Sequence, residues 1–135
     1  MITSAEEFVE LRTSEDPDIY SRAVLESAPE EVWLAVITKY PDMKRAVVHN
    51  KTIPISILRL LMADPNPRVR SAVAEKRKLS HDMFEKLAMD PDLSVRGRIV
   101  WNRKTPLSIL RELANDEDPD IAEGARERIK EIEQG

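Results

Sequence analysis

Short groups of apolar residues alternate with polar turns along this chain of 135 residues. In residues 57–61 the apolar side chains stand at positions i, i+1 and i+4, and in residues 69–73 they stand at i, i+3 and i+4. Both spacings place the side chains on one face of an α-helix. Residues 64–67 read Asp-Pro-Asn-Pro, and proline neither continues a helix nor favours one in the residue before it. The pattern therefore predicts two short helices joined by a turn.

The same two-helix pattern recurs every 26 residues. Asp64, Asp90 and Asp116 are spaced by this interval. Apolar positions that follow it are Leu61, Leu87 and Leu113; Leu58, Phe84 and Leu110; and Val69, Val95 and Ile121. A fixed period of this length is typical of a solenoid, in which each unit buries its apolar face against its neighbours. We therefore predict a single all-α solenoid domain over residues 1–135.

The two ends of the predicted solenoid differ from its middle. Residues 24–127 hold the repeats, whereas residues 1–23 form a degenerate N-terminal cap and residues 128–135 end a C-terminal cap. Ser4, followed three residues later by Glu7, makes a capping box for an opening helix. Terminal units are expected to be atypical because one face of each must meet water.

The repeated turn resembles that of a known family. Residues 64–70 and 90–96 reproduce the Asp…Val-Arg signature of HEAT repeats. The short period, with Asn-Lys-Thr at residues 50–52 and Asn-Arg-Lys-Thr-Pro at 102–106, resembles the leucine-rich repeat variant branch of that group. The resemblance implies a right-handed superhelix of paired helices, but no single activity. The iron–sulfur centre of some variant-repeat proteins needs cysteines, which this chain lacks.

The resemblance also implies a structural role for the repeated charges. In HEAT repeats the turn aspartate and the arginine six residues later form a hydrogen-bonded ladder between units. The positions that match are Asp64, Asp90, Asp116, Arg70 and Arg96. Charge-assisted hydrogen bonds to turn amides suit both residue types. Since Ala122 replaces the next arginine, we expect the ladder to end there.

Composition and charge limit the kinds of function that the chain can have. The absence of cysteine excludes disulfides and thiol catalysis. No charged-then-apolar leader and no long apolar stretch is present, so we expect a soluble, cytoplasmic protein without membrane contact. Residues 1–36 carry a net charge of −7, residues 37–111 carry +9 and residues 112–135 carry −6. A basic middle between acidic ends favours an anionic partner, although basic turns also serve solubility alone.

No catalytic, cofactor or metal site is expected. His49 and His81 lie in different units and lack a nucleophilic partner at a recognisable spacing, so we expect both to be exposed near helix ends. The three glycines form no phosphate-binding loop. The alternating aspartates of residues 116–120 resemble the start of a calcium loop, but Ile121 stands where that loop requires glycine. We therefore predict that the chain is not an enzyme.

A basic stripe along one edge is a stronger candidate for a site. In each unit a loop places cations at matching positions, namely Lys51, Arg77 and Arg103, then Lys78 and Lys104. These loops fall at the same edge of a stacked solenoid, so the stripe presents positive charge at a regular interval. Turns between helices are polar in any case, and this second interpretation stays open.

Two tryptophans stand at positions that other repeats leave polar. An exposed Trp101 beside Arg103 has the composition of a binding hot spot, unless the ring folds back over its own helix. Trp33 is expected to pack beneath the N-terminal unit. Arg98 occupies a small-residue core position, so its stem either extends out to solvent or points towards a ligand. Gly97 beside it suggests a close approach there.

The sequence therefore predicts a non-enzymatic binding or adaptor protein. By analogy with similar small repeat proteins, its partner is a protein, and an immunity-type inhibitor of a toxin is one such case. The alternative is nucleic-acid backbone binding through the basic edge. The net charge of −4 and the scarcity of aromatic residues argue against that alternative. The oligomeric state stays open.

Overall fold

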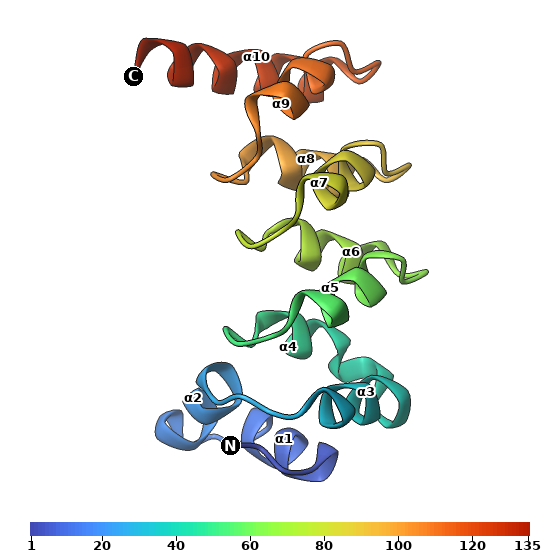
Figure 1. Cartoon of the computed structure of the whole chain (residues 1–135), viewed down its shortest axis with the longest axis vertical. Coiled ribbons are helices and arrows are strands. Elements are labelled where there is room, and N and C mark those ends of the chain that lie inside the picture. The colour runs from blue at the N-terminus through green and yellow to red at the C-terminus, as the bar shows by residue number, and fades with distance from the viewer. The chain divides into compact units, whose positions relative to one another are not determined.

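The chain is entirely helical. A computed structural model describes residues 1–135 and contains ten α-helices, one 3-10 helix and no strand (Figure 1). This confirms the predicted all-α class. The helices form two compact units, Met1–Ala63 and Asp64–Gly135.

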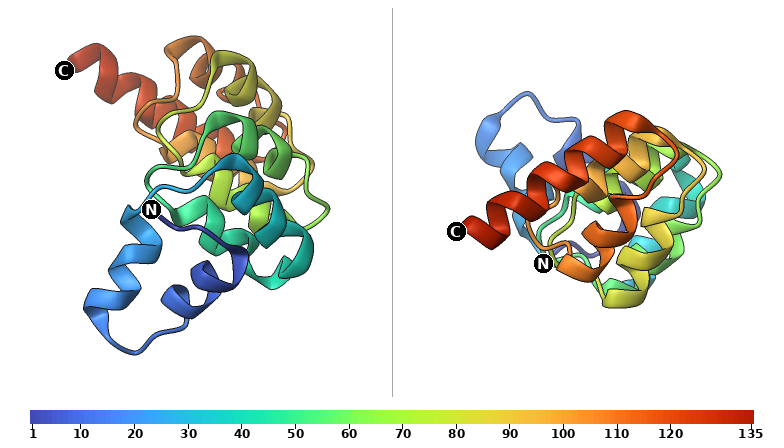
Figure 2. Two further views of the ribbon diagram at one scale, coloured as in Figure 1. Left: turned by 60° about the horizontal axis from the view of Figure 1, so that its bottom comes forward. Right: turned by 90° about the horizontal axis from the view of Figure 1, so that it is seen from above.

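The first unit contains five α-helices around a small apolar core. They are α1 (Ala5–Arg12), α2 (Pro17–Leu25), α3 (Glu30–Lys39), α4 (Lys44–His49) and α5 (Ile55–Met62). Helix α1 packs against α2 and α3, and α3 packs against α4 and α5. The left view of Figure 2 shows α1 and α2 joined by their connecting loop. A 3-10 helix, Pro41–Met43, leads directly into α4.

The N-terminal predictions hold with one change of detail. Ser4 caps α1, and its hydroxyl accepts a hydrogen bond from Glu7 N at 3.0 Å. The Glu7 carboxylate reaches back to Thr3 N at 2.8 Å instead of to Ser4 N. Trp33 is fully buried and meets Phe8 edge-on, with ring centroids 5.3 Å apart. This contact confirms that Trp33 packs beneath the N-terminal helix.

The second unit consists of two layers of helices (Figure 1). One layer contains α6 (Pro67–Ala74), α8 (Leu93–Trp101) and α10 (Pro119–Gln134), and the other contains α7 (His81–Ala88) and α9 (Leu107–Leu113). Helix α8 packs against both α6 and α10, and α7 packs against α9. Apolar side chains from both layers fill the space between them. The views of Figure 2 show the last turns of α10 extending beyond α9.

The helices of the first layer begin at side-chain caps that the turns supply. Asn66, Asp92 and Asp118 each accept a hydrogen bond from the backbone N–H two residues later, at 2.9, 2.8 and 3.0 Å. Such caps satisfy amides that have no partner inside the helix. The last helix starts at Pro119, directly after its cap Asp118, because proline is tolerated in a first turn.

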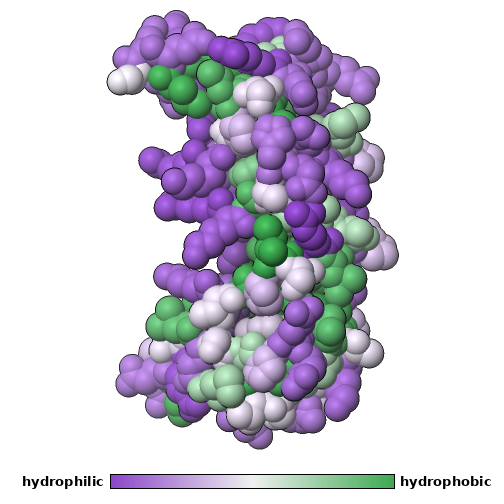
Figure 3. All heavy atoms as spheres, in the orientation of Figure 1, coloured by the Kyte–Doolittle hydropathy of each residue, from purple (hydrophilic) through white to green (hydrophobic).

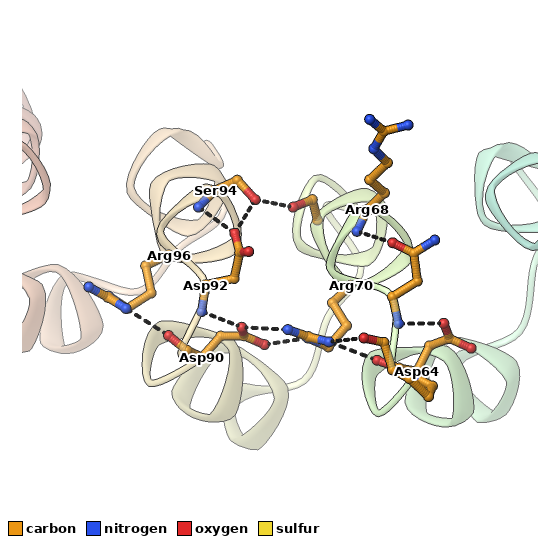
Figure 4. Close-up of polar contacts among 10 residues, drawn as sticks. Asp64, Arg68, Arg70, Asp90, Asp92, Ser94 and Arg96 are labelled. Carbon is orange, nitrogen blue, oxygen red and sulfur yellow. Dashed lines mark hydrogen bonds and ion pairs between the residues drawn. The ribbon is translucent and has the colours of Figure 1, made fainter.

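A ladder of charged hydrogen bonds joins successive turns of this unit. Arg70 donates to both carboxylate oxygens of Asp90, at 2.8 and 3.1 Å, and Arg96 does the same to Asp116 at 2.9 and 3.1 Å. Each arginine also donates to a carbonyl of its own turn, Arg70 to Asp64 at 2.9 Å and Arg96 to Asp90 at 2.8 Å. Figure 4 shows the Arg70 guanidinium between the two turns. The bonds to Asp90 raise the pKa of Arg70 above its usual value.

A second set of hydrogen bonds at the other end of the helices was not anticipated. Asn102 and Arg128 have buried side chains that donate to backbone carbonyls. Asn102 reaches the end of α6 and the loop after it, and Arg128 reaches the end of α8 and the residue after it. In the first unit, Asn50 donates in the same way to Ala23 O at 2.8 Å and Glu26 O at 2.9 Å. Side-chain hydrogen bonds therefore connect neighbouring segments of backbone at both ends of the helices.

Candidate partner-binding site

The indole of Trp101 lies on the surface of the second unit. Trp101 is the last residue of α8, and 55% of its surface is exposed, whereas Trp33 is 0% exposed. The core face of α8 is occupied by Val95, Ile99 and Val100, so helical geometry turns the next residue outwards. Core packing explains the position of Trp33, but it does not explain why the large ring of Trp101 is exposed.

Gly124 of α10 holds one edge of the exposed ring. A Cβ atom at Gly124 would lie 3.4 Å from Cζ2 of Trp101 and 3.2 Å from Cγ1 of Val100. The absence of a side chain at Gly124 therefore lets the indole lie directly against α10. The ring is exposed but oriented, and this lowers the conformational entropy that a partner must remove on binding.

Trp101 lies between two open pockets. A pocket of about 240 Å³, here called the arginine pocket, is lined by Glu75, Arg77, Arg98, Trp101, Asn102 and Arg103. A pocket of about 430 Å³, here called the α10 pocket, is lined by Trp101, Arg103, Arg128, Glu131 and Ile132. Trp101 and Arg103 line both, so a single bound segment can touch both pockets at once.

The arginine pocket has more positive than negative charge. Its one carboxylate, Glu75, binds Arg98 with an N–O distance of 2.9 Å. Arg77 and Arg103 make no ion pair, and both are exposed. In Figure 3, hydrophilic atoms project along the edge of the second unit where the α6–α7 and α8–α9 loops lie. Two guanidinium groups are thus available to an anionic ligand.

The structure brings four of the predicted site residues together. These are Arg77, Arg98, Trp101 and Arg103. Lys78 and Lys104 follow the two loop arginines and are exposed, but they do not line either pocket. Lys51 is exposed in the loop after α4 and belongs to the first unit.

Arg98 reaches the surface, as one of its two predicted interpretations required. Its side chain is 58% exposed and binds Glu75, the C-cap residue of α6. The expectation for Gly97 was wrong, because a Cβ there would meet only Ile121 Cδ1 at an ordinary 3.7 Å. The close approach occurs at Gly124 instead.

Sequence reasoning missed the α10 side of the site. Arg128, Glu131 and Ile132 lie in a helix that its polar composition marked only as a closing cap. The available signal was Arg128, which stands 26 residues after Asn102. That spacing places the last turns of α10 beside Trp101.

A third open pocket, away from Trp101, is an alternative candidate site. It has a volume of about 750 Å³ and is bordered by Met89, which is 80% exposed, and by Glu112 and Glu117. Arg96 and Asp116 also line it, but they are bound to each other in the ladder. This Met89 pocket offers one exposed apolar side chain and the carboxylates of Glu112 and Glu117, and no aromatic ring lines it.

The two histidines and the aspartates of residues 116–120 have plain positions in the fold. His49 and His81 are exposed, at the end of α4 and the start of α7. Asp116 and Asp118 accept hydrogen bonds from the backbone and from Arg96, as residues of a repeat turn do. No group of three or more His, Asp or Glu side chains is arranged to hold a metal ion. None of the helices has both the length and the apolar character needed to cross a membrane.

Comparisons of this chain with protein-family models, with curated proteins and with solved structures gave no match.

Proposed function

We propose that this chain is a binding protein with no enzymatic activity of its own, and that its second unit holds a protein partner against Trp101. The observation that carries the proposal is the exposed indole, seated on Gly124 between two pockets. Tryptophan and arginine are the residue types most enriched among the residues that dominate protein–protein binding energy. A ring that is already oriented also costs less to immobilise.

The ion pairs of the second unit favour a binding function over a catalytic one. Arg70 with Asp90 and Arg96 with Asp116 are the ion pairs of the second unit in which both side chains are largely buried. Their hydrogen-bonding atoms are occupied by each other and by turn amides and carbonyls. Groups held in this way stabilise the fold and are poorly placed to transfer protons.

We further propose that the chain is a HEAT-like solenoid with a 26-residue unit, as its sequence pattern predicts. The repeated bonds of Arg70 and Arg96, each to an aspartate 20 residues later, support this. Tandem duplication of residues 79–104 adds one full unit and should give a folded chain with a single melting transition, because solenoids gain units without loss of register. Duplication of residues 79–98 breaks the register and should destabilise the fold. Equal melting behaviour of the two insertions would argue against the solenoid.

A Trp101-dependent capture experiment tests the binding proposal. Wild-type chain, Trp101→Ala and Met89→Ala are immobilised and exposed to the same native lysate, with parallel nuclease and protease digestion. A protein that wild type and Met89→Ala retain, and that Trp101→Ala loses, supports the site. We expect Trp101→Ala to weaken binding of that protein by about 2 kcal/mol, the scale of a hot spot.

The controls separate binding from folding. Trp101→Ala should melt close to wild type, since its ring is half exposed and contributes little to the core. Loss of capture with Met89→Ala alone would move the site to the Met89 pocket. A Trp101→Ala variant that melts several degrees lower and still binds normally would show that the ring is part of the core.

Nucleic-acid binding is the alternative outcome of the same experiment. Duplex DNA contacts made only by the exposed loop cations should fade near physiological salt, because counterion release makes such contacts strongly salt-dependent. DNA binding that is selective for sequence and survives at about 0.15 M salt would favour the alternative.

A further inference from the structure

The pocket beside Trp101 contains arginine side chains that no carboxylate of the chain neutralises. Arg77 and Arg103 flank the arginine pocket without an ion-pair partner, and Lys78 and Lys104 add positive charge beside them. The only carboxylate in the pocket already binds Arg98. A guanidinium presents a planar fork that matches a carboxylate in two parallel hydrogen bonds. One or two carboxylates from a partner would therefore balance this pocket.

An apolar ledge lies next to this positive charge. Ile132 is 44% exposed and lines the α10 pocket together with the face of Trp101. Figure 3 shows hydrophobic atoms beside the C-terminal half of α10. Arg128 lines the same pocket, is buried, and donates to Val100 O and Asn102 O. The floor of the ledge is thus fixed by the fold, and Arg103 stands at its border with the arginine pocket.

We propose that the segment bound at Trp101 is an acidic peptide, in which Asp or Glu side chains enter the arginine pocket and a neighbouring apolar side chain covers the ledge of Trp101 and Ile132. This inference rests on the proposed function and adds the chemistry of the partner. Trp101 and Arg103 line both pockets, so the pockets adjoin and a short peptide reaches both when its acidic and apolar residues are close together.

The charges of the second unit favour a peptide over a nucleic acid. Residues 64–135 contain 14 basic and 15 acidic residues, a net charge of −1. Glu75 and Glu131 stand within the two pockets. A nucleic acid carries a charge on every phosphate and would meet these carboxylates. A short peptide can place its few charges beside Arg77 and Arg103 and its apolar side chain elsewhere.

Selection from a random-peptide phage library tests the inference without presupposing a partner. The library is selected on wild-type chain, on the double variant Arg77→Glu with Arg103→Glu, and on Arg68→Glu as a matched control. Arg68 is an exposed arginine of α6 outside both pockets, and Figure 4 shows its guanidinium pointing away from the ladder. We expect wild type and Arg68→Glu to enrich peptides with Asp or Glu beside an apolar residue. The double charge reversal should enrich basic peptides instead.

Affinities of the best enriched peptide complete the test. Its binding should weaken about tenfold or more when Trp101 is replaced by alanine, when Arg103 is replaced by glutamate, or when its acidic residues are changed to amides. Equal weakening by Arg68→Glu would show unspecific charge attraction and overturn the inference. Failure to enrich peptides, or enrichment of neutral ones, would also overturn it. So would an oligonucleotide that competes more strongly than the peptide near physiological salt.

The two proposals fail in different ways. If lysate capture depends on Trp101 but is unaffected by Arg103→Glu, the chain binds a partner there and the acidic-peptide inference is wrong. If capture does not depend on Trp101, both proposals are wrong.

Discussion

Asn102 and Arg128 stand 26 residues apart and donate hydrogen bonds to carbonyls that are also 26 residues apart. The Asn102 amide reaches Ala74 O and Lys76 O, both at 2.8 Å. Arg128 reaches Val100 O and, at 3.1 Å, Asn102 O. A short amide and a long guanidinium therefore satisfy equivalent backbone groups. These carbonyls lie at helix ends, where no intrahelical donor is left to satisfy them.

Asn102 should contribute to stability because its side chain is buried and its amide nitrogen donates to two backbone carbonyls. Replacement by alanine leaves two buried carbonyls without their donor, so we expect the free energy of unfolding to fall by about 1–3 kcal/mol. Asn115→Ala is the matched control, since Asn115 is exposed and its side chain makes no such bond. It should change stability by less than about 0.5 kcal/mol. Urea denaturation of both variants measures the difference, and equal values would contradict the role given to Asn102.

The ladder arginines should behave as structural residues. Arg70→Ala removes a bidentate pair in which both side chains are largely buried, 15% and 8% exposed, so we expect a loss of about 1–3 kcal/mol. Arg96→Ala should match it, and Arg68→Ala should have little effect. Arg70→Lys should recover only part of the loss, because an ammonium cannot form the planar fork. Binding of the enriched peptide by the folded fraction should not change. Lost binding with an unchanged melting temperature would reverse this assignment.

The repeat explains why much of the second unit was predictable. Asp64, Asp90 and Asp116 recur at a fixed interval because each performs the same hydrogen-bonding task in its turn. Helices α7 and α9 begin directly after Ser80 and Pro106, and residues of these types favour a helix start within one turn of the chain. The 3-10 helix at Pro41–Met43 differs from the later turns, because Tyr40 stands where Asn66, Asp92 and Asp118 supply a side-chain cap.

The candidate site was only half predictable for a related reason. Trp101 stood out because it departs from the repeat, and Arg103 stood out because it continues the repeated basic position of Lys51 and Arg77. Both signals are visible in sequence. The partners of the ring were not visible in the same way. Gly124 supports the indole through the absence of a side chain, and Ile132 joins the site only because α10 continues past α9. Both effects depend on how α8 and α10 pack.

Asp92 should give the second unit a measurable dependence on pH. Hydrogen bonds from the Ser94 hydroxyl and amide lower the pKa of Asp92, the cap of α8. A carboxyl with a lowered folded-state pKa contributes stability that is present above its unfolded value, about 3.9 for Asp, and lost as the pH falls through the folded value. Asp92→Asn keeps a good cap without that titration. The melting temperature of wild type relative to Asp92→Asn should therefore decrease as the pH is lowered from about 6 towards 2. A constant difference would contradict this.

Gly97 and Gly124 provide a matched pair of helix-interior glycines. Alanine at either position should gain up to about 1 kcal/mol in helix propensity. At Gly97 the new Cβ finds ordinary space, so Gly97→Ala should raise the melting temperature and leave peptide binding unchanged. At Gly124 the new Cβ would lie tightly against Val100, at 3.2 Å, and would touch the Trp101 ring at an ordinary 3.4 Å. Because Val100 is buried, relief of this contact requires α10 to shift slightly away from α8, which also changes the support of the Trp101 ring. We expect Gly124→Ala to gain less stability, to shift tryptophan fluorescence and to weaken the enriched peptide. Trp33 lies in the first unit and gives a constant background, so fluorescence that does not change would show that Trp101 is not seated on Gly124.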